Sequence, residues 1–310
     1  MATTTSSTLS SVVKTVYDRL LYYDLRSQPT FDMICDVKPA LQAMPGNQVV
    51  WTLMNNLSAA TSTLSESTDI TPVTLSTSQV TATLNEYGNG VELTAFLRAT
   101  GFIDVDEATL NVLGYNLADS LDQVAVAQLD AGSNVIYSGG ASGRSTLTPT
   151  NTITAADVRN AVANLRTNKA IPKKQGYYVG FVHPHVSYDI RTATSAAANA
   201  SWRESHIYAS PEAIYAGEIG AWEGVAFVET PRAPEFLNAG SSPTTTNVFA
   251  TIIVGQQALA KAVAIDPHLV QSPVTDRLRR IVNYGWYALL GYVRFREAAI
   301  YRIESASALN

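Results

Sequence analysis

The sequence is poor in charged residues and has a single cysteine. Only 15% of its 310 residues are charged, and 21 Lys plus Arg against 26 Asp plus Glu give a net charge of −5. An average protein carries about a quarter of its residues as charges, and one that coats nucleic acid has a basic excess. That class is therefore disfavoured here. The lone Cys35 excludes an internal disulfide and a cysteine-based metal cluster.

Long apolar runs are missing as well. No stretch approaches the ~18 apolar residues of a membrane span, and Met1 to Ser11 has neither the basic start nor the apolar segment of a secretory signal. We therefore expect a soluble protein made inside the cell, without a membrane partner. Its length and its 46% apolar residues suffice for one large domain or two modest ones.

The shortage of charge is concentrated, because no Lys or Arg occurs from Pro39 to Leu97. Within this interval, Gln48 to Leu57 and Val80 to Leu93 alternate β-branched and aromatic residues loosely, which predicts two strands. The Ser/Thr-rich Ser58 to Ser78 between them has too little apolar surface for a core. We predict a long hairpin. About 20 extended residues reach roughly 65 Å, beyond the ~20 Å radius of a compact domain, so a neighbouring subunit must cover it.

Four other segments have helical signatures. Apolar spacing predicts a helix from Thr8 to Leu25 and a longer one from Asp104, its expected cap, to Gly132, about 40 Å in length. Thr154 with Asp157 caps a further helix, and Pro184 opens the last.

The remaining segments are read as loops and strands. Ser133 to Thr150 is expected to be a flexible Gly/Ser/Thr loop, and a short basic loop follows the Thr154 helix. Strands are expected at Tyr177 to Val182, Val225 to Glu229, Asn247 to Gly255 and Val282 to Ile303, the last as one or two strands that return the chain to its first helix. The order of elements indicates a mixed α+β fold.

No motif carries recognisable chemistry. The Gly-rich loop lacks the Gly-Lys-Ser/Thr of a phosphate-binding loop and the second Gly of a nucleophile elbow. His183 and His185 flank Pro184 and would hold a metal if a third ligand joined them, but a strand that leads into a Pro-initiated helix explains them equally. Cys35 is read as a small buried hydrophobe rather than a nucleophile. We expect no enzyme, cofactor, metal or catalytic residue.

A basic group near the end of the chain has two interpretations. Its members are Arg277, Arg279, Arg280, Arg294, Arg296 and Arg302. They form either a face for nucleic acid or ion pairs between subunits with Asp266, Asp276 and Glu297. We favour the ion pairs.

The order of these parts resembles the major capsid proteins of tailed bacteriophages, which share the HK97-like shell fold. The resemblance covers nearly the whole chain from about Pro39 and is carried by four features in order. These are Leu64-Ser65-Glu66-Ser67 before Thr71-Pro72, Asn85-Glu86-Tyr87-Gly88 before Val91-Glu92-Leu93-Thr94, the long helix to Gly132, and Gly217-Glu218-Ile219-Gly220 through Glu223-Gly224-Val225 to Glu229-Thr230-Pro231.

The resemblance implies an α+β, HK97-like capsid fold with five parts. They are an N-terminal arm (1–47), an extended loop or E-loop (48–94), a peripheral domain (95–150) with a spine helix (104–131), a mainly axial domain (151–262) and strands that return to the peripheral domain (263–310). Some members of the family link subunits covalently through a Lys on the E-loop. This loop has no Lys, so such a cross-link is not expected.

The implied function is a structural protein that self-assembles into pentamers and hexamers and then an icosahedral head around double-stranded DNA. The DNA would be enclosed without sequence-specific binding, and the protein would reside in the virion after assembly in the host cytoplasm. A scaffolding protein and a portal are the expected partners, and a decoration protein is a further candidate. Two alternatives stay open: an encapsulin-like compartment shell, and a Thr-rich surface adhesin or decoration protein.

Overall fold

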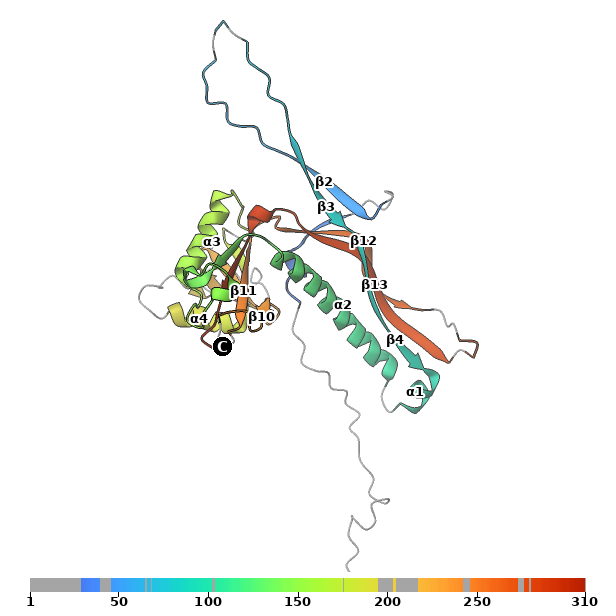
Figure 1. Cartoon of the computed structure of the whole chain (residues 1–310). Helices are drawn as coiled ribbons and strands as arrows, with labels where there is room; N and C mark the ends of the chain where they lie inside the picture. The colour runs from blue at the N-terminus through green and yellow to red at the C-terminus, as the bar shows by residue number, and fades with distance from the viewer. Residues whose placement is uncertain are drawn as a thin grey trace, which may run out of the picture.

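The structure is a computed structural model that describes residues 29–39, 46–64, 66–67, 69–101, 104–174, 176–194, 203–204, 217–241, 246–272, 276–278 and 280–309. The helix expected at Thr8 to Leu25 lies outside these residues. Two sheets and a separate hairpin make up the strand structure, and Figure 1 shows the hairpin projecting from the rest. Among the described residues, no helix combines the length and apolarity that crossing a bilayer requires.

The larger sheet has eight strands. Their order is β5-β14-β11-β6-β9-β8-β7, and β10 pairs with β11. The bounds are β5 Val135–Tyr137, β6 Tyr178–Val182, β7 Arg203–Glu204, β8 Glu218–Trp222, β9 Val225–Glu229, β10 Glu235–Phe236, β11 Val248–Val254 and β14 Ile300–Ser305. The helices α3 (Ala155–Thr167) and α4 (Pro184–Thr194) flank this sheet (Figure 1).

Both faces of this sheet are buried, as the alternation along β6 shows. Tyr178 and Val182 belong to a core shared with α3 and α4, whereas Val179 and Phe181 belong to a second core shared with the long helix. A strand buried on both faces has no polar side, which is why the sequence of β6 is an unbroken apolar run.

The smaller sheet has the order β1-β12-β13-β4. Its strands are β1 (Asp36–Pro39), β12 (Leu259–Gln271), β13 (Ile281–Arg294) and β4 (Asn85–Thr94). The short α1 (Ala95–Thr100) leads from β4 toward α2 (Val105–Asp130), which runs beside the sheet (Figure 1). Asp104 caps α2 as predicted, because its side chain accepts from the backbone N–H of Asp106 at 3.0 Å. The 26 residues of α2 span about 40 Å.

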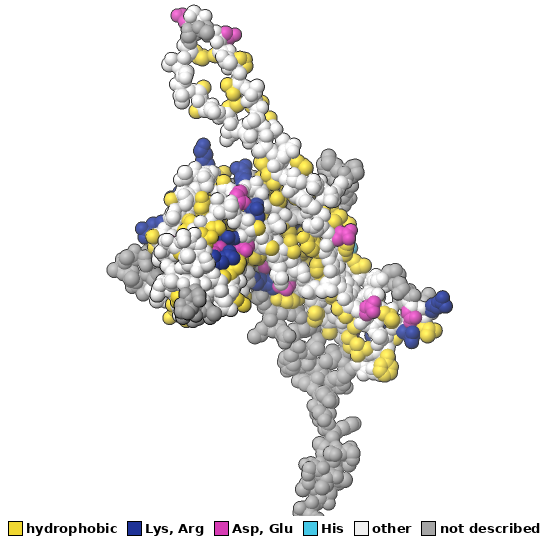
Figure 2. Space-filling view, in the orientation of Figure 1, with side chains coloured by type: hydrophobic (Ala, Val, Ile, Leu, Met, Phe, Trp, Pro, Cys, Tyr) yellow, Lys and Arg dark blue, Asp and Glu magenta, His cyan; other side chains and the backbone are white. Residues whose placement is uncertain are grey.

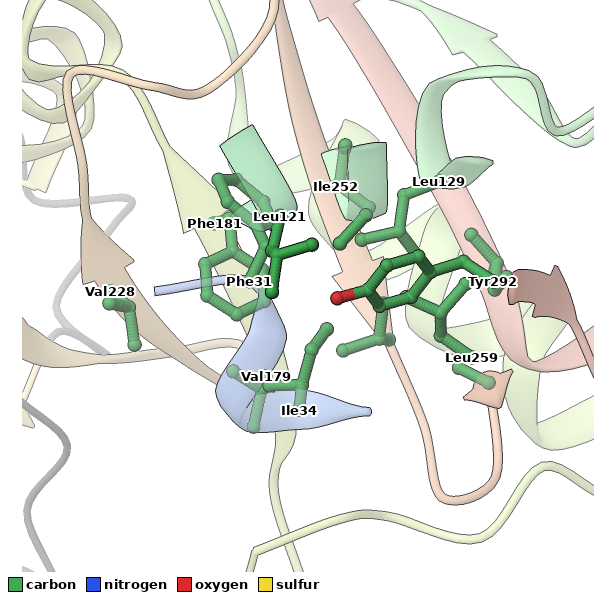
Figure 3. Packing of buried hydrophobic residues seen from close by; sticks show 14 of the residues in the cluster. Phe31, Ile34, Leu121, Leu129, Val179, Phe181, Val228, Ile252, Leu259 and Tyr292 are labelled. Atoms are coloured by element: carbon green, nitrogen blue, oxygen red, sulfur yellow. The ribbon is translucent and has the colours of Figure 1, made fainter. Parts of the chain in front are cut away.

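The chain before β1 is wedged between the two sheets. Phe31, fully buried, packs against Phe181 with ring centroids 4.5 Å apart, and Ile34 lies in the same core (Figure 3). The short 3₁₀ turn η2 (Asp32–Ile34) between them is therefore enclosed by side chains of both sheets and of α2.

A buried carboxylate holds this segment to α2. Asp122, with no exposed surface, accepts the backbone N–H groups of Phe31 at 2.7 Å and Asp32 at 3.1 Å through Oδ1. Its Oδ2 lies 3.4 Å from Nη1 of Arg232. Burial raises the pKa of Asp122, while the backbone donors act in the opposite direction. Asp32 in turn receives Lys261 Nζ at 2.9 Å and the Tyr292 hydroxyl at 2.7 Å.

The hairpin consists of β2 (Gln48–Met54) and β3 (Thr77–Thr83), paired antiparallel from Gln48 opposite Thr83 to Met54 opposite Thr77. Its base rests on the end of β13. Trp51 meets Phe295 edge-on at 6.0 Å, and a Cβ placed on Gly291 would lie 2.2 Å from the carbonyl oxygen of Thr83. Only glycine permits so close an approach of the two backbones.

Most predicted elements within the described residues are present, and two differ. Val80 to Leu93 is two strands rather than one, because the chain leaves the hairpin at Leu84 and enters the smaller sheet as β4. Ser133 to Thr150 contains β5 and two 3₁₀ turns, η3 (Ser138–Gly140) and η4 (Arg144–Thr146). The prediction of a flexible loop over this whole segment is therefore wrong. Val282 to Ile303 forms two strands, as the prediction allowed, and β14 joins the larger sheet. The first helix, to which these strands were expected to return, lies outside the described residues.

From the contacts of Asp122 we predict that its substitution lowers the free energy of unfolding more than substitution of the nearby Asp119. Asp122→Leu leaves two buried N–H groups without an acceptor, so we expect the free energy of unfolding to fall by about 3 kcal/mol. Asp119→Leu removes the part-exposed carboxylate that pairs with Arg232 and should cost roughly 1 kcal/mol or less. Urea unfolding of the dilute subunit measures both. Equal losses would contradict the role given to Asp122.

We predict that alanine substitution changes the stability in opposite directions at Gly291, at the base of the hairpin, and at Gly114, in α2. Gly291→Ala forces β13 and β3 apart, and we expect a loss of about 2 kcal/mol. Gly114→Ala is the matched control, because Gly114 lies in α2 with no atom within 4 Å of its added methyl group. Alanine in a helix should raise the stability by about 0.5 to 1 kcal/mol. Thermal unfolding checks the two signs, and a neutral Gly291→Ala would refute the close crossing.

Candidate functional site

The hairpin is the most exposed apolar feature of the described chain. It carries the exposed residues Val50, Met54, Leu57, Leu64, Ile70, Val73 and Leu75. Figure 2 shows these hydrophobic side chains along the hairpin, acidic side chains at its tip and no basic ones on this part of the visible face. The only charged residues from 46 to 83 are Glu66 and Asp69.

The distal hairpin is held together by few contacts of its own. Beyond Met54 and Thr77 the two legs are no longer paired as strands, and the side chain of Asn55 bonds to Ser76 and Ser78 at 3.1 Å. A lone two-stranded ribbon is marginally stable in water. An exposed apolar ribbon of this kind therefore marks a surface that another molecule covers.

A groove of about 580 Å³ lies where the hairpin meets the rest of the subunit. Its lining residues come from the hairpin, the end of α3, the β11–β12 turn and the 3₁₀ turn η7 (Glu297–Ala299). Met54 and Ile171, both more than 60% exposed, supply apolar surface. Lys169 and Arg296 supply positive charge.

A second exposed apolar area lies at the far end of the smaller sheet. Phe96 of α1 is 78% exposed and Leu278, in the β12–β13 connection, is 71% exposed. Arg98 pairs with Asp106 in the same region. The subunit thus presents apolar side chains at two ends, the hairpin and the α1 end (Figure 2).

His183 and His185 pack together beside Phe249. His183 stacks on Phe249 at 4.7 Å, and its Nδ1 accepts the backbone N–H of His185 at 3.3 Å. Burial, reinforced by the neighbouring His185, lowers the pKa of His183 to about 4. Among the described residues no group of three or more His, Cys, Asp or Glu side chains is arranged to hold a metal ion.

Cys35 sits against the core around α2. Burial is the main cause that raises the pKa of its thiol, and the nearby Asp32 adds to the rise. A thiol with a raised pKa is a poor nucleophile, which agrees with the interpretation as a small buried hydrophobe.

The expected arginine group is dispersed, and its ion pairs lie within the chain. Arg280 pairs with Asp276 at 3.1 Å, and Arg294 with Glu297 at 2.6 Å. Asp276 and Glu297, which the prediction assigned to pairs between subunits, thus have an arginine partner within the chain, and pairing between subunits stays a prediction. Arg280 and Arg294 lie at opposite ends of β13, about 45 Å apart at ~3.3 Å per residue.

The other members of the group lie elsewhere. Arg302 is on β14 and pairs with Asp130 at the end of α2 at 2.9 Å. Arg296 lines the groove. Arg277 is exposed in the β12–β13 connection, and Arg279 lies outside the described residues. No continuous basic face results within the described chain.

Two functional features were missed in the sequence. Lys169 and Arg296 are 127 positions apart, and nothing in their local patterns links them. Asp122 directly follows Leu121, but the sequence does not distinguish it from Asp130, which directly follows the buried Leu129 and is itself 27% exposed.

The comparisons with known proteins agree on one family. The sequence matches the family described as "Phage capsid protein" over residues 2–309. A comparison with curated protein sequences finds no match.

Three solved structures with the same fold are a phage capsid, a phage capsid asymmetric unit and a phage head. The capsid of Ralstonia phage GP4 has a TM-score of 0.78 at 14% identity, covering 96% of both chains. The capsid asymmetric unit of cyanophage Pam1 has a TM-score of 0.72 at 18% identity and covers 97% of this chain and 98% of its own. The head structure of Helicobacter pylori bacteriophage KHP40 has a TM-score of 0.68 at 14% identity and covers 99% and 98%.

The family match and the fold leave the compartment-shell and adhesin alternatives without support. The two sheets, the long α2 and the projecting hairpin are the arrangement of an HK97-like shell protein, and the hairpin and the α1 end expose apolar side chains. The chain therefore belongs to the phage capsid protein family, as a structural major capsid protein of a tailed bacteriophage that builds the homo-oligomeric icosahedral head shell of the virion.

Proposed function

We propose that the subunits assemble into pentamers and hexamers, which then close into a head around double-stranded DNA. The observation that carries this proposal is the β2–β3 hairpin, whose apolar side chains are exposed on the isolated subunit. A ribbon of this kind gains stability when it lies across a neighbour. Each subunit makes several such contacts at once, so individually modest interfaces suffice.

We also propose a division of the chain among assembly roles. Residues 1–47 form an arm that passes under a neighbour, and residues 48–94 form the E-loop, of which β2 and β3 are the projecting part and β4 the return. Residues 95–150 and 263–310 belong mainly to the peripheral domain with its spine helix α2. Residues 151–262 form most of the axial domain at the capsomer centre. The short β5 and β14 extend the axial sheet from the flanking segments.

The partners of the shell are inferred from its chemistry. The net charge of −5 supports DNA that is contained without sequence-specific binding, because a coating protein needs a basic excess. A scaffolding protein that sets the curvature, a portal at one vertex and assembly in the host cytoplasm complete the proposal. A decoration protein is a further candidate partner.

Electron microscopy and sedimentation test the proposal together with a deletion. The full-length chain, alone and co-expressed with its scaffolding protein, should give closed shells or rings of five and six subunits. Removing Ser58 to Ser78 leaves Gln48 to Thr52 paired with Gln79 to Thr83. That variant should keep its fold and lose stable shells.

The folded state of the deletion variant is checked by circular dichroism and thermal unfolding, since it keeps the contact between Trp51 and Phe295. A full-length chain that stays monomeric under every condition would overturn the assembly proposal. Shells that form undiminished from the deletion variant would overturn the role given to the hairpin.

A further inference from the structure

The groove at the base of the hairpin has the composition of a docking site. Met54 and Ile171 expose apolar surface at its edge, and Lys169 and Arg296 add two positive charges. Its one carboxylate, Glu297, is already occupied by Arg294 at 2.6 Å and by the backbone N–H of Ser133 at 2.7 Å. Among the residues that the structure describes, neither Lys169 nor Arg296 pairs with a carboxylate. A ligand for this groove is therefore acidic and partly apolar.

The position of Lys169 is fixed by the backbone. Lys169 follows the last turn of α3 with φ of 57°, in the left-handed region, and its N–H donates to the carbonyl of Arg166 at 2.9 Å. The next residue, Ala170, donates to the carbonyl of Leu165 at 2.9 Å. These bonds end the helix and hold the backbone of Lys169 at the rim of the groove, from which its flexible side chain can reach a ligand.

The tip of the hairpin has the complementary composition. Glu66 and Asp69 are exposed and are the only charges on the hairpin, and Leu64 and Ile70 beside them are exposed by 78% and 61%. Asp69 accepts the N–H of Ile70 at 2.8 Å, a local turn that keeps the carboxylate at the tip. Two acids between apolar side chains match two cations between apolar side chains.

The occupant belongs to another copy of the chain. The hairpin projects away from the rest of the subunit (Figure 1), and Glu66 is 12 positions beyond Met54 of the groove lining, up to about 40 Å in extended form. A contact between the tip of one copy and the groove of the next is head-to-tail, and such a contact closes into rings when it is repeated around an axis.

We propose that the acidic tip at Glu66 and Asp69 docks into the groove at Lys169 and Arg296 of a neighbouring subunit. This inference rests on the proposed assembly and specifies the acceptor surface that the hairpin meets. The pairing couples charge attraction to the burial of Leu64 and Ile70 against Met54 and Ile171. It also explains why the long interval without Lys or Arg retains acids at its tip, since a basic residue there would oppose the acceptor.

Charge reversal and its restoration test the pairing. Lys169→Glu with Arg296→Glu should lower the yield of shells or capsomers about tenfold at a fixed subunit concentration, because each contact becomes repulsive. Glu66→Lys with Asp69→Lys should do the same. The four substitutions together re-create opposite charges and should restore assembly to within about twofold of the wild type.

A net-charge control separates contact from overall charge. Glu235→Lys and Asp266→Lys, two exposed acids remote from the groove lining, are added to the groove reversal instead of the tip changes. This variant has the same net charge as the fourfold one and should stay defective. Sedimentation and electron microscopy count the assemblies, and thermal unfolding confirms that each subunit folds.

The experiment distinguishes failure of the docking site from failure of the assembly proposal. If the wild type assembles and the groove reversal assembles equally well, the docking site is refuted while the assembly proposal stands. Rescue by the net-charge control, or no rescue by the fourfold variant, also refutes it. If the wild type itself never forms capsomers, the assembly proposal fails first.

Discussion

The carboxylate of Asp122 is the point at which three separate parts of the chain are tied together. It sits on α2, accepts two backbone N–H groups from the segment before β1 and faces Arg232, which follows β9 of the larger sheet. A buried carboxylate is costly to desolvate, and here at least three donors compensate that cost. Because the same segment continues into β1 of the smaller sheet, the Asp122 contact also fixes how the two sheets meet.

The relation between the two sheets decides where the hairpin points. The hairpin leaves the subunit over β13, at the crossing of Thr83 and Gly291, and β13 lies in the smaller sheet. The groove beside it is lined from the larger sheet through the end of α3 and the β11–β12 turn. The proposed docking surface thus draws on elements of both halves of the subunit, so it depends on the cores around Phe31 and Asp122 being formed.

Local chemistry made much of this fold predictable. The caps at Asp104 and Thr154 and the apolar run of β6 each follow from a few neighbouring residues, and the structure confirms them. The change of sheet at Leu84 was missed, because no Gly or Pro lies at that point. A local signal was present, since the apolar residues shift there from even positions, ending at Leu84, to odd positions, beginning at Tyr87. The groove was also missed, because Lys169 and Arg296 meet only through tertiary structure.

The hairpin is long and is held at its base by a close backbone crossing at Gly291, so a small rotation at the base moves the tip far. The tip stands on the order of 60 Å from this crossing when the paired strands and the extended legs are taken at ~3.3 Å per residue. At that length a rotation of about 10° at the base carries the tip roughly 10 Å. The direction of the hairpin therefore depends on one close backbone crossing, which the absence of a side chain at Gly291 permits.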